Sequence, residues 1–397
     1  MSRSNNRPVT AYDVAVIGAG TTGASIAYFL TQRGLRPVVF EKTRAAGGPS
    51  GASAGMCRQH YADPAIIDMA KWGCEFLSDM KARTGFQSGY SMSGYLVVGG
   101  PERERAIRGV YETMRARGVD VELCDVDRIL ELEPRLYAGD LSIGCYEPTG
   151  GHAQPLFVAD GFVRAAERDG ATLRLGTRVT GLRPDGDGWT LWLGDGTRAS
   201  AEVVIVACGP WANTLTRGLG GVVPLALSRG QAGRFRPRHA FGPPGPIISD
   251  HVHELWIKPE GNDGHYLIGG RGGRLDRSPH KRPTGQAGAD DAMLETFASE
   301  LAHRLPGTSG GVWRGSWSSF YDFTPDANPV IDHIPGRANL IVATGMSGHC
   351  FKLAPSLGRG TAELVVDGEV RSFDWSVFAY GRFARPRGRL AAGRGPG

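Results

Sequence analysis

Short apolar runs separated by glycine-rich turns fill the first forty residues. Residues 12–17 form a short, mostly apolar run, which is typical of a buried parallel strand. Residues 24–33 place their apolar side chains on one side of a helix, and Gly34 ends that helix. Residues 38–40, VVF, predict a second strand. The chain therefore begins with a predicted β-α-β unit.

The same alternation returns later in the chain. A helical segment that contains Phe162 ends at Gly170, and residues 172–182 alternate between apolar and polar as a strand does. Residues 340–343 predict a further strand, and we expect the next helix to begin near Cys350. This order of elements indicates an α/β enzyme with many strands.

The turn between the first strand and its helix reads GAGTTG. In a dinucleotide-binding turn, three glycines permit a tight bend, close approach of a pyrophosphate, and close packing of helix on strand. Gly18, Gly20 and Gly23 hold these places, and the helix N-terminus offers free N–H groups to the phosphates. Glu41 follows Gly23 by eighteen residues and can accept hydrogen bonds from ribose hydroxyls, which disfavours NADP. This fingerprint fits NAD and FAD alike.

Length and composition predict an ordinary globular protein of two domains. The 397 residues exceed one simple core, and the shares of 41% hydrophobic and 21% charged residues are normal. The net charge of +5 comes from five arginines within residues 381–397, so it does not indicate nucleic-acid binding. We expect residues 1–9 and 381–397 to be disordered tails.

The sequence shows no pattern typical of a metal site, a membrane span or a signal peptide. The six cysteines form no CxxC motif and stand at no zinc spacing with histidine, so we predict no metal site. No apolar run is long enough to span a membrane, and the N-terminus lacks a signal-peptide pattern. We therefore expect a cytoplasmic monomer or homodimer with reduced thiols.

A second glycine-rich segment distinguishes between NAD and FAD as the cofactor. Residues 47–61 read GGPSGASAGMCRQHY, and their small side chains can come close to a flat ring system. Residues 203–212 end in ACGPWA, and residues 324–352 contain TPDANPVI and SGHCFK. These segments resemble the D-amino-acid-oxidase-like flavoenzymes, most of all the branch of sarcosine oxidase and glycine oxidase. In that family the second segment wraps FAD, so the resemblance implies FAD.

The resemblance also implies the fold and the layout of the chain. The fold class would be α/β, with a discontinuous Rossmann-type FAD-binding domain and an inserted α+β substrate domain on an antiparallel sheet. The FAD-binding domain would contain residues 10–95, 150–218 and 324–380. The substrate domain would contain residues 96–149 and 219–323.

The residues that contact FAD follow from the same resemblance. They would come from the two glycine loops, two strand ends and the C-terminal signature loop. The expected contacts are Gly18, Gly20, Thr22, Gly23, Glu41, Lys42, Ser50, Ser53, Ala54, Gly55, Val179, Cys208, Gly209, Trp211, Gly345, Ser347, Gly348, His349, Cys350, Phe351 and Lys352. The N–H groups of the signature loop would favour negative charge on the flavin.

Four residues are expected at the substrate. In the sarcosine oxidase branch, the positions of Arg58 and Lys352 hold the substrate carboxylate, and a structural ion pair is the alternative for each. Tyr321 would form a wall of the pocket, with a core tyrosine as the alternative. We expect His349 to hold its loop by hydrogen bonds rather than to act as a base.

The chain departs from these relatives at several positions. Ser319 stands where monomeric sarcosine oxidases attach flavin to a cysteine, and residues 52–53 lack the histidine of other members, so we predict non-covalent FAD. Cys350 replaces a glycine and is expected to fill space, with a reactive thiol or an attachment point as alternatives. Sarcosine oxidases use a lysine to help oxygen react, and its position aligns with Leu267 or Ile268 here. Oxygen and another molecule are therefore both possible as the electron acceptor.

Two further sets of residues are expected to lie away from the reaction. Trp256, Trp313 and Trp317 are interpreted as core residues, and a core position is also the alternative for Trp211, which is an expected FAD contact. Lys258 is close in sequence to the position of the oxygen-reacting lysine but stands out of register with it; the alternative is a slip in the alignment, by which Lys258 would be that lysine.

The favoured function is FAD-dependent oxidation of a C–N bond in a small amine or amino acid that carries a carboxylate. Secondary, N-methyl or cyclic amino acids are favoured, and a hydride would pass to flavin N5 and leave an imine. Cys350 in place of a glycine and Ser319 in place of a cysteine alter the pocket relative to these enzymes, which also favours a tailoring step in a small-molecule pathway. The main alternative is an FAD-dependent 2-hydroxyacid oxidase or dehydrogenase, which needs a base such as His349, His60 or His253. An NAD-dependent dehydrogenase and a non-catalytic flavin-binding protein are further alternatives.

Overall fold

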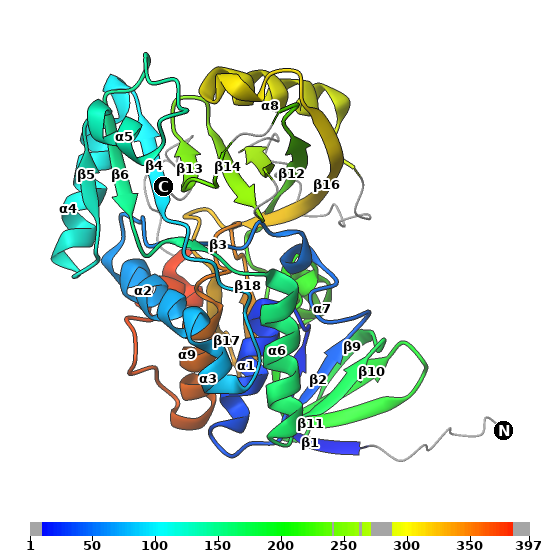
Figure 1. Cartoon of the computed structure of the whole chain (residues 1–397). Helices are drawn as coiled ribbons and strands as arrows, with labels where there is room; N and C mark the ends of the chain where they lie inside the picture. The colour runs from blue at the N-terminus through cyan, green and yellow to red at the C-terminus, as the bar shows by residue number, and fades with distance from the viewer. Residues whose placement is uncertain (1–9, 240–241, 262–263, 271–287, 384–397) are drawn as a thin grey trace.

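Two large sheets dominate the computed structural model, which describes residues 10–239, 242–261, 264–270 and 288–383 (Figure 1). One sheet lies in the lower half of Figure 1 and the other in the upper half. Most of the two predicted tails lies outside the described residues. Arg382, which we assigned to the C-terminal tail, forms a salt bridge with Asp326 at 2.8 Å and is therefore fixed to the domain.

The first sheet has eight strands, in the order β17-β18-β11-β1-β2-β8, with β10 on β11 and β9 on β10. Its strands are β1 (Thr10–Ile17), β2 (Val38–Glu41), β8 (Thr172–Leu175), β9 (Val179–Asp185), β10 (Gly188–Leu193), β11 (Arg198–Val206), β17 (Val330–Ile334) and β18 (Arg337–Thr344). The central strands are parallel, and Val16 of β1 lies opposite Ile205 of β11 and Val39 of β2. All three residues are buried, as expected for a parallel sheet covered on both faces.

Three helices pack side by side on one face of this sheet. They are α1 (Thr21–Thr31), α6 (Pro155–Arg168) and α9 (Ala354–Asp367), and α1 contacts both of the others. Ile26, Phe162 and Leu357 are buried between them. A Cβ atom at Gly358 would lie 2.2 Å from Ser25 Oγ, so glycine permits the close approach of α9 to α1. Further along, α2 (Pro64–Ser78) packs on α9 and leads into α3 (Met80–Thr84).

The second sheet has the order β16-β12-β15-β14-β13-β4-β6-β5. Its strands are β4 (Tyr95–Gly99), β5 (Glu122–Cys124), β6 (Ile143–Glu147), β12 (Ala226–Arg236), β13 (Ile247–Asp250), β14 (Leu255–Glu260), β15 (His265–Gly270) and β16 (Val312–Phe323). Ile257 and Ile268 of this sheet share a core with Leu301 of α8 (Asp291–Arg304). The expected antiparallel pairing is confirmed except between β4 and β13, which are parallel.

Smaller elements join the two sheets. A two-stranded sheet of β3 (Met56–Cys57) and β7 (Gly151–His152) follows the second glycine loop. The other described helices are α4 (Glu104–Ala116), α5 (Val126–Leu132), α7 (Ala212–Thr216) and the 3-10 turns η1 (Pro49–Ala52), η2 (Pro101–Arg103), η3 (Gly209–Trp211), η4 (Arg217–Leu219), η5 (Pro306–Thr308), η6 (Ser376–Phe378) and η7 (Tyr380–Phe383). The predicted α/β class with a second sheet is confirmed. In the described part of the chain, no helix is long and apolar enough to cross a membrane.

Two expected elements differ in detail. The predicted strand over 172–182 is two strands, β8 and β9, because Gly176 turns the chain between them with a φ of +72°. The last helix begins at Ala354 rather than near Cys350. Pro355 has no N–H to donate, so it fits only the first turn of a helix, and the residues before it form separate tight turns.

Candidate active site

A cavity of about 800 Å³ lies where the two sheets meet. One wall comes from the carboxyl ends of β1, β2, β11 and β18, and the facing wall comes from β12, β14 and β16. Ligands of open α/β sheets bind outside the carboxyl ends of the strands, where the turns into the helices also lie. The volume is within the range of about 300–1,000 Å³ that is typical of cofactor pockets.

Most of the residues predicted to contact a cofactor line this cavity. They are Gly18, Gly20, Thr22, Glu41, Lys42, Ser50, Ser53, Ala54, Val179, Cys208, Gly209, Trp211, Gly348, His349, Cys350 and Phe351. The predicted contacts that are not among its lining residues are Gly23, Gly55, Gly345, Ser347 and Lys352. Arg58 does not line it either, whereas Tyr321 does.

The first glycine loop is shaped by backbone contacts that leave no room for side chains. Gly18 has a φ of +111°, and a Cβ atom there would lie 2.5 Å from the carbonyl oxygen of Ala207. A Cβ atom at Gly23 would lie 2.0 Å from the carbonyl oxygen of Gly18. The turn therefore leads directly into α1, which has no acidic residue in its first turn. Its N-terminus favours an anion in the cavity.

Glu41 and Lys42 are fixed at the end of β2. The carboxylate of Glu41 accepts hydrogen bonds from the N–H groups of Ala19 at 3.0 Å and Thr43 at 2.9 Å. The ammonium of Lys42 lies 3.4 Å from the ring centroid of Trp211, across the cavity wall. Burial lowers the pKa of Lys42, while the charge of Glu41 opposes this effect.

The C-terminal signature loop is held by Asp322, which our sequence analysis missed. One carboxylate oxygen of Asp322 accepts hydrogen bonds from the N–H of Gly345 at 2.9 Å and the hydroxyl of Thr344 at 3.3 Å. Its backbone oxygen accepts a third from the N–H of Ser347 at 3.2 Å. Burial raises the pKa of Asp322 to about 6, although the Gly345 N–H opposes this. An acidic residue inside the aromatic run FYDF was the signal for this role.

His349 holds the same loop through both ring nitrogens. Nε2 donates to the carbonyl oxygen of Ala327 at 2.7 Å, since a carbonyl can only accept, and Nδ1 accepts from the hydroxyl of Tyr61 at 3.3 Å. Burial and the charge of Lys352 lower the pKa of His349 to about 3. The ring is therefore neutral, and this arrangement supports the predicted anchoring role.

Arg58 and Lys352 meet at Tyr61. The ammonium of Lys352 donates to the hydroxyl of Tyr61 at 2.9 Å and to the backbone oxygen of His349 at 2.9 Å. The guanidinium of Arg58 lies 4.5 Å from the ring centroid of Tyr61 and donates to the backbone oxygen of His60. Both cations are buried, with 7% and 3% of their surfaces exposed. Within the described ranges neither forms a salt bridge with a carboxylate, which speaks against the alternative of a structural ion pair.

A buried acid lies near the two cations. Burial and the charge of Arg58 lower the pKa of Lys352 to about 7. Glu147 is fully buried, and its pKa rises to about 7 through burial although both cations oppose the rise. One of its oxygens accepts from the N–H of Gln59 at 2.6 Å, and the other has no hydrogen-bond partner among the described residues. Because arginine stays ionised in proteins, this cluster keeps at least the positive charge of Arg58.

Tyr321 occupies space that two glycines leave open. A Cβ atom at Gly348 would lie 2.9 Å from its ring, and one at Gly230 would lie 2.5 Å from it. The ring therefore sits between β12 and the signature loop, at the cavity. This position supports the predicted role as a wall over that of a core tyrosine.

The interpretation of Trp256 and Trp317 as core residues is wrong, because both line the cavity. The Trp317 indole N–H donates to the backbone oxygen of Ala52 at 2.9 Å and so joins β16 to the second glycine loop. Lys258 lies two residues beyond Trp256, and alternate residues of a strand share a face. Lys258 therefore shares a face of β14 with Trp256, but it is not among the residues that line the cavity; it is buried and pairs with Glu260 at 3.1 Å.

Comparisons with known proteins agree with this geometry. The family model described as FAD dependent oxidoreductase, DAO, matches residues 13–364. Glycine oxidase of Geobacillus kaustophilus is 28% identical over 380 residues, which is 94% of this chain and 97% of that protein. Monomeric sarcosine oxidase of Streptomyces avermitilis is 27% identical and covers 90% of this chain and 94% of its own.

A solved structure gives a similar result for the fold. The crystal structure of L-proline dehydrogenase from P. horikoshii superposes with a TM-score of 0.87 at 23% identity. It covers 96% of this chain and 100% of its own. At this identity the likeness concerns the fold alone.

Proposed function

This chain belongs to the DAO family of FAD-dependent oxidoreductases, and we propose that it oxidises the C–N bond of a small amine or amino acid to an imine. The substrate carries a carboxylate, and a secondary, N-methyl or cyclic amino acid fits best. The named relatives, glycine oxidase and monomeric sarcosine oxidase, support an amine substrate of this kind.

The observation that carries the proposal is the pair of buried cations at Tyr61. Buried charges in proteins are normally paired, because an isolated buried ion is costly. Arg58 and Lys352 share one tyrosine and, in the described part of the chain, have no carboxylate in a salt bridge. A substrate carboxylate would complete this arrangement.

The cavity fits FAD by its shape and by its donors. The tight turn at Gly18 and the open N-terminus of α1 would take the pyrophosphate, and Glu41 would face the ribose. When bound, FAD supplies the hydride acceptor of the reaction. The two sheets support an FAD-binding domain of residues 10–95, 150–218 and 324–380 and a substrate domain of residues 96–149 and 219–323.

The chain's own residues would bind and orient the substrate. An ammonium has three N–H donors, and Lys352 uses two of them on Tyr61 and His349, so one is left for the substrate. Arg58 would offer its planar fork to the second carboxylate oxygen. Tyr321 would exclude water from the side of the cavity that it covers.

Non-covalent attachment is the expected state of the flavin. Ser319 and Cys350 both line the cavity, and burial raises the pKa of the Cys350 thiol, which leaves little reactive thiolate. A serine at the one position and an unreactive thiol at the other favour release of the flavin on unfolding.

Oxidation of a 2-hydroxy acid is disfavoured by its need for a base. The three histidines considered for that role are unsuited to it. Both ring nitrogens of His349 are engaged, and burial lowers the pKa of His60 well below its usual value. His253 contacts Asp140 and does not line the cavity.

The test is anaerobic mixing of the purified protein with matched substrates while the visible flavin absorbance is followed. The set holds glycine, N-methyl amino acids, cyclic imino acids, their carboxamides and the corresponding 2-hydroxy acids. We expect bleaching by the amines with a free carboxylate and little by the carboxamides. Bleaching by hydroxy acids alone would overturn the proposal, and admission of air then separates oxygen from another electron acceptor. Slow turnover of all common amino acids would point to a tailoring step on a specialised substrate.

A further inference from the structure

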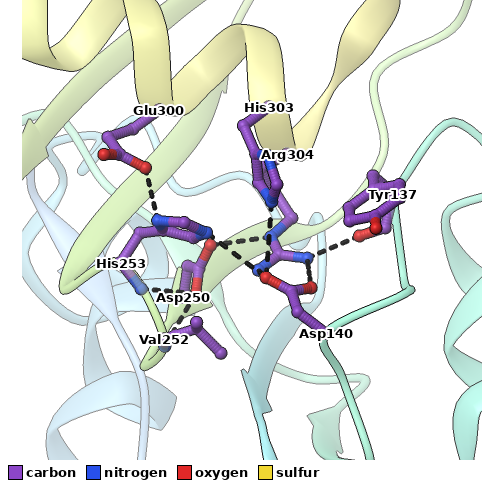
Figure 2. A network of polar contacts seen from close by, with 8 residues as sticks. All are labelled: Tyr137, Asp140, Asp250, Val252, His253, Glu300, His303 and Arg304. Carbon is purple, nitrogen blue, oxygen red and sulfur yellow. Dashed lines mark hydrogen bonds and ion pairs between the residues drawn. The ribbon is translucent and has the colours of Figure 1, made fainter.

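Three side chains of types that can bind a metal ion come together beside α8, at the turn between β13 and β14 (Figure 2). Asp140 comes from the loop before β6, His253 from the turn between β13 and β14, and His303 from the last turn of α8. Their candidate ligand atoms all lie within 4.8 Å of one another. None of the three residues lines the cavity of the candidate active site.

The distances in this cluster match those around a small metal ion. His253 Nε2 lies 3.3 Å, and His303 Nε2 lies 3.4 Å, from the same oxygen of Asp140, Oδ2. Two ligands that each lie about 2.05 Å from a tetrahedral zinc ion are about 3.3 Å apart. The three side chains are already close to the spacing that such an ion needs.

The contacts of His253 with two carboxylates fit either a second ring proton or a metal ion on one ring nitrogen. Its Nε2 faces Asp140, and its Nδ1 forms a short contact with the carboxylate of Glu300. Ionised carboxylates only accept, whereas a neutral imidazole has a single N–H. A metal on Nε2 with a proton on Nδ1 would satisfy both contacts. A carboxylate behind a metal-bound histidine is the usual second partner of such ligands.

Asp140 is held in place as an ionised ligand. Arg304 is fully buried and donates to both oxygens of Asp140, at 2.7 and 3.0 Å, and to Asp250 at 2.7 Å. Each carboxylate oxygen has two lone pairs, so Oδ2 can bind Arg304 and still face the histidines.

The charge of the surroundings favours a divalent ion. Three carboxylates, those of Asp140, Asp250 and Glu300, stand against the one guanidinium of Arg304. With neutral histidines the cluster carries two negative charges. The side chains of Asp140, His253 and His303 are 28%, 21% and 44% exposed, so an ion from solution can reach them.

We propose that Asp140, His253 and His303 bind one divalent transition-metal ion, with Zn²⁺ as the best fit. Two imidazoles and one carboxylate suit zinc, and water would fill the remaining position. The ion would join three segments that are distant in sequence, namely the loop before β6, the β13–β14 turn and α8. Its role would be to stabilise the substrate domain, and it is independent of the proposed flavin chemistry.

Equilibrium dialysis of the flavin-containing protein against ZnCl₂ tests the proposal, after removal of any affinity tag and of metals with a chelator. The variants are His303→Ala and His253→Ala, and the matched control is His239→Ala, an exposed histidine outside the cluster. We expect about one zinc ion per chain in the wild type and the control. In both cluster variants the affinity should fall by roughly tenfold or more.

Thermal unfolding gives a second readout. Zinc should raise the melting temperature of the wild type and of His239→Ala, but not that of His303→Ala. His303 is half-exposed, so its loss should leave the fold intact, and this variant decides the matter if His253→Ala fails to fold. Equal zinc affinity and equal melting shifts in wild type and His303→Ala would overturn the proposal. His253 would then be an imidazolium held between Asp140 and Glu300.

Discussion

The ammonium of Lys352 and the hydroxyl of Tyr61 form a buried hydrogen bond of 2.9 Å. Tyr61 also contacts His349, a residue of the cavity wall, at 3.3 Å, and its ring lies beside the guanidinium of Arg58. One tyrosine therefore sets the position of both cations relative to the cavity.

Tyr61→Phe should weaken the binding of carboxylate substrates specifically. Loss of the hydroxyl removes one partner of the Lys352 ammonium, and a hydrogen bond to a charged group contributes about 1.5–3 kcal/mol. We expect KM for a carboxylate substrate to rise roughly tenfold or more. Steady-state kinetics with an amino acid and its carboxamide measure this. Tyr28→Phe is the control, because it loses a hydroxyl bond to Arg83 at 3.2 Å outside the site. An equal rise for both substrates would contradict the assigned role.

Substrate binding should weaken as the pH rises above neutrality. The pKa of Lys352 lies at about 7 instead of 10.5, because burial and the charge of Arg58 disfavour its charged form. The ammonium is thus half protonated at about pH 7, is fully present well below that pH and is lost as the pH rises through it. A bound carboxylate stabilises the ammonium, so kcat/KM should fall with pH in this range more than kcat does. In Lys352→Met this dependence should disappear, with a high KM at every pH. A wild-type kcat/KM that stays flat up to pH 9 would refute the assignment.

His349→Gln should keep most of the activity. The glutamine amide can donate to Ala327 and accept from Tyr61, as the neutral imidazole does. Loss of a general base costs about 10²–10⁴-fold in rate. We expect the rate of anaerobic flavin reduction to fall by less than about tenfold. A fall of several hundredfold, together with loss of an ionisation from the pH profile, would identify His349 as a base instead.

The flavin should leave the polypeptide when the protein is denatured. Acid precipitation followed by absorbance of the supernatant and the pellet measures the free and attached fractions. We expect all yellow colour in the supernatant for the wild type, Cys350→Ser and Cys208→Ser. Colour that stays with the wild-type pellet and is released by Cys350→Ser would show attachment through that thiol.

A pair of helical glycines should respond in opposite ways to alanine. In α1, a Cβ atom at Gly23 would meet the Gly18 carbonyl at 2.0 Å, whereas in α4 none lies within 4 Å of Gly109. Gly23→Ala should destabilise the protein by about 1–3 kcal/mol or more and reduce its flavin content. Gly109→Ala should stabilise it by about 0.5–1 kcal/mol, because alanine restricts the unfolded chain. Chemical denaturation measures both changes, and similar stabilities would show that the turn at Gly18 can relax.

The sequence could predict those parts of the site whose residues lie close together in one segment of the chain. Gly18, Gly20 and Gly23 stand within one turn, and their spacing, together with the apolar strand before them, the helix after them and Glu41, predicts a dinucleotide-binding unit. Asp322 and Glu147 were missed because their roles depend on backbone groups supplied by other segments, 23 residues away for Gly345 and 88 residues away for Gln59.

Tertiary packing also determines the positions of residues that the local sequence pattern did not predict correctly. Trp256 and Trp317 look like core residues in their strands, but the second sheet turns this face toward the cavity. The helix expected near Cys350 begins later because Pro355 fixes its first turn. The cluster of Asp140, His253 and His303 has no motif spacing, since each residue comes from a different element.

The strand order of the first sheet determines when a newly synthesised chain can become functional. β1 is made first but pairs with β11, and β11 pairs with β18 at Arg337–Thr344. The ribosome must therefore release nearly the whole polypeptide before the sheet can close. Until β11 is made, β1 can pair with β2 on one edge, but its other edge has no partner. Such long-range pairing is slow and exposes the nascent chain to aggregation. The protein is thus expected to acquire its cofactor after translation and to depend on chaperones until then.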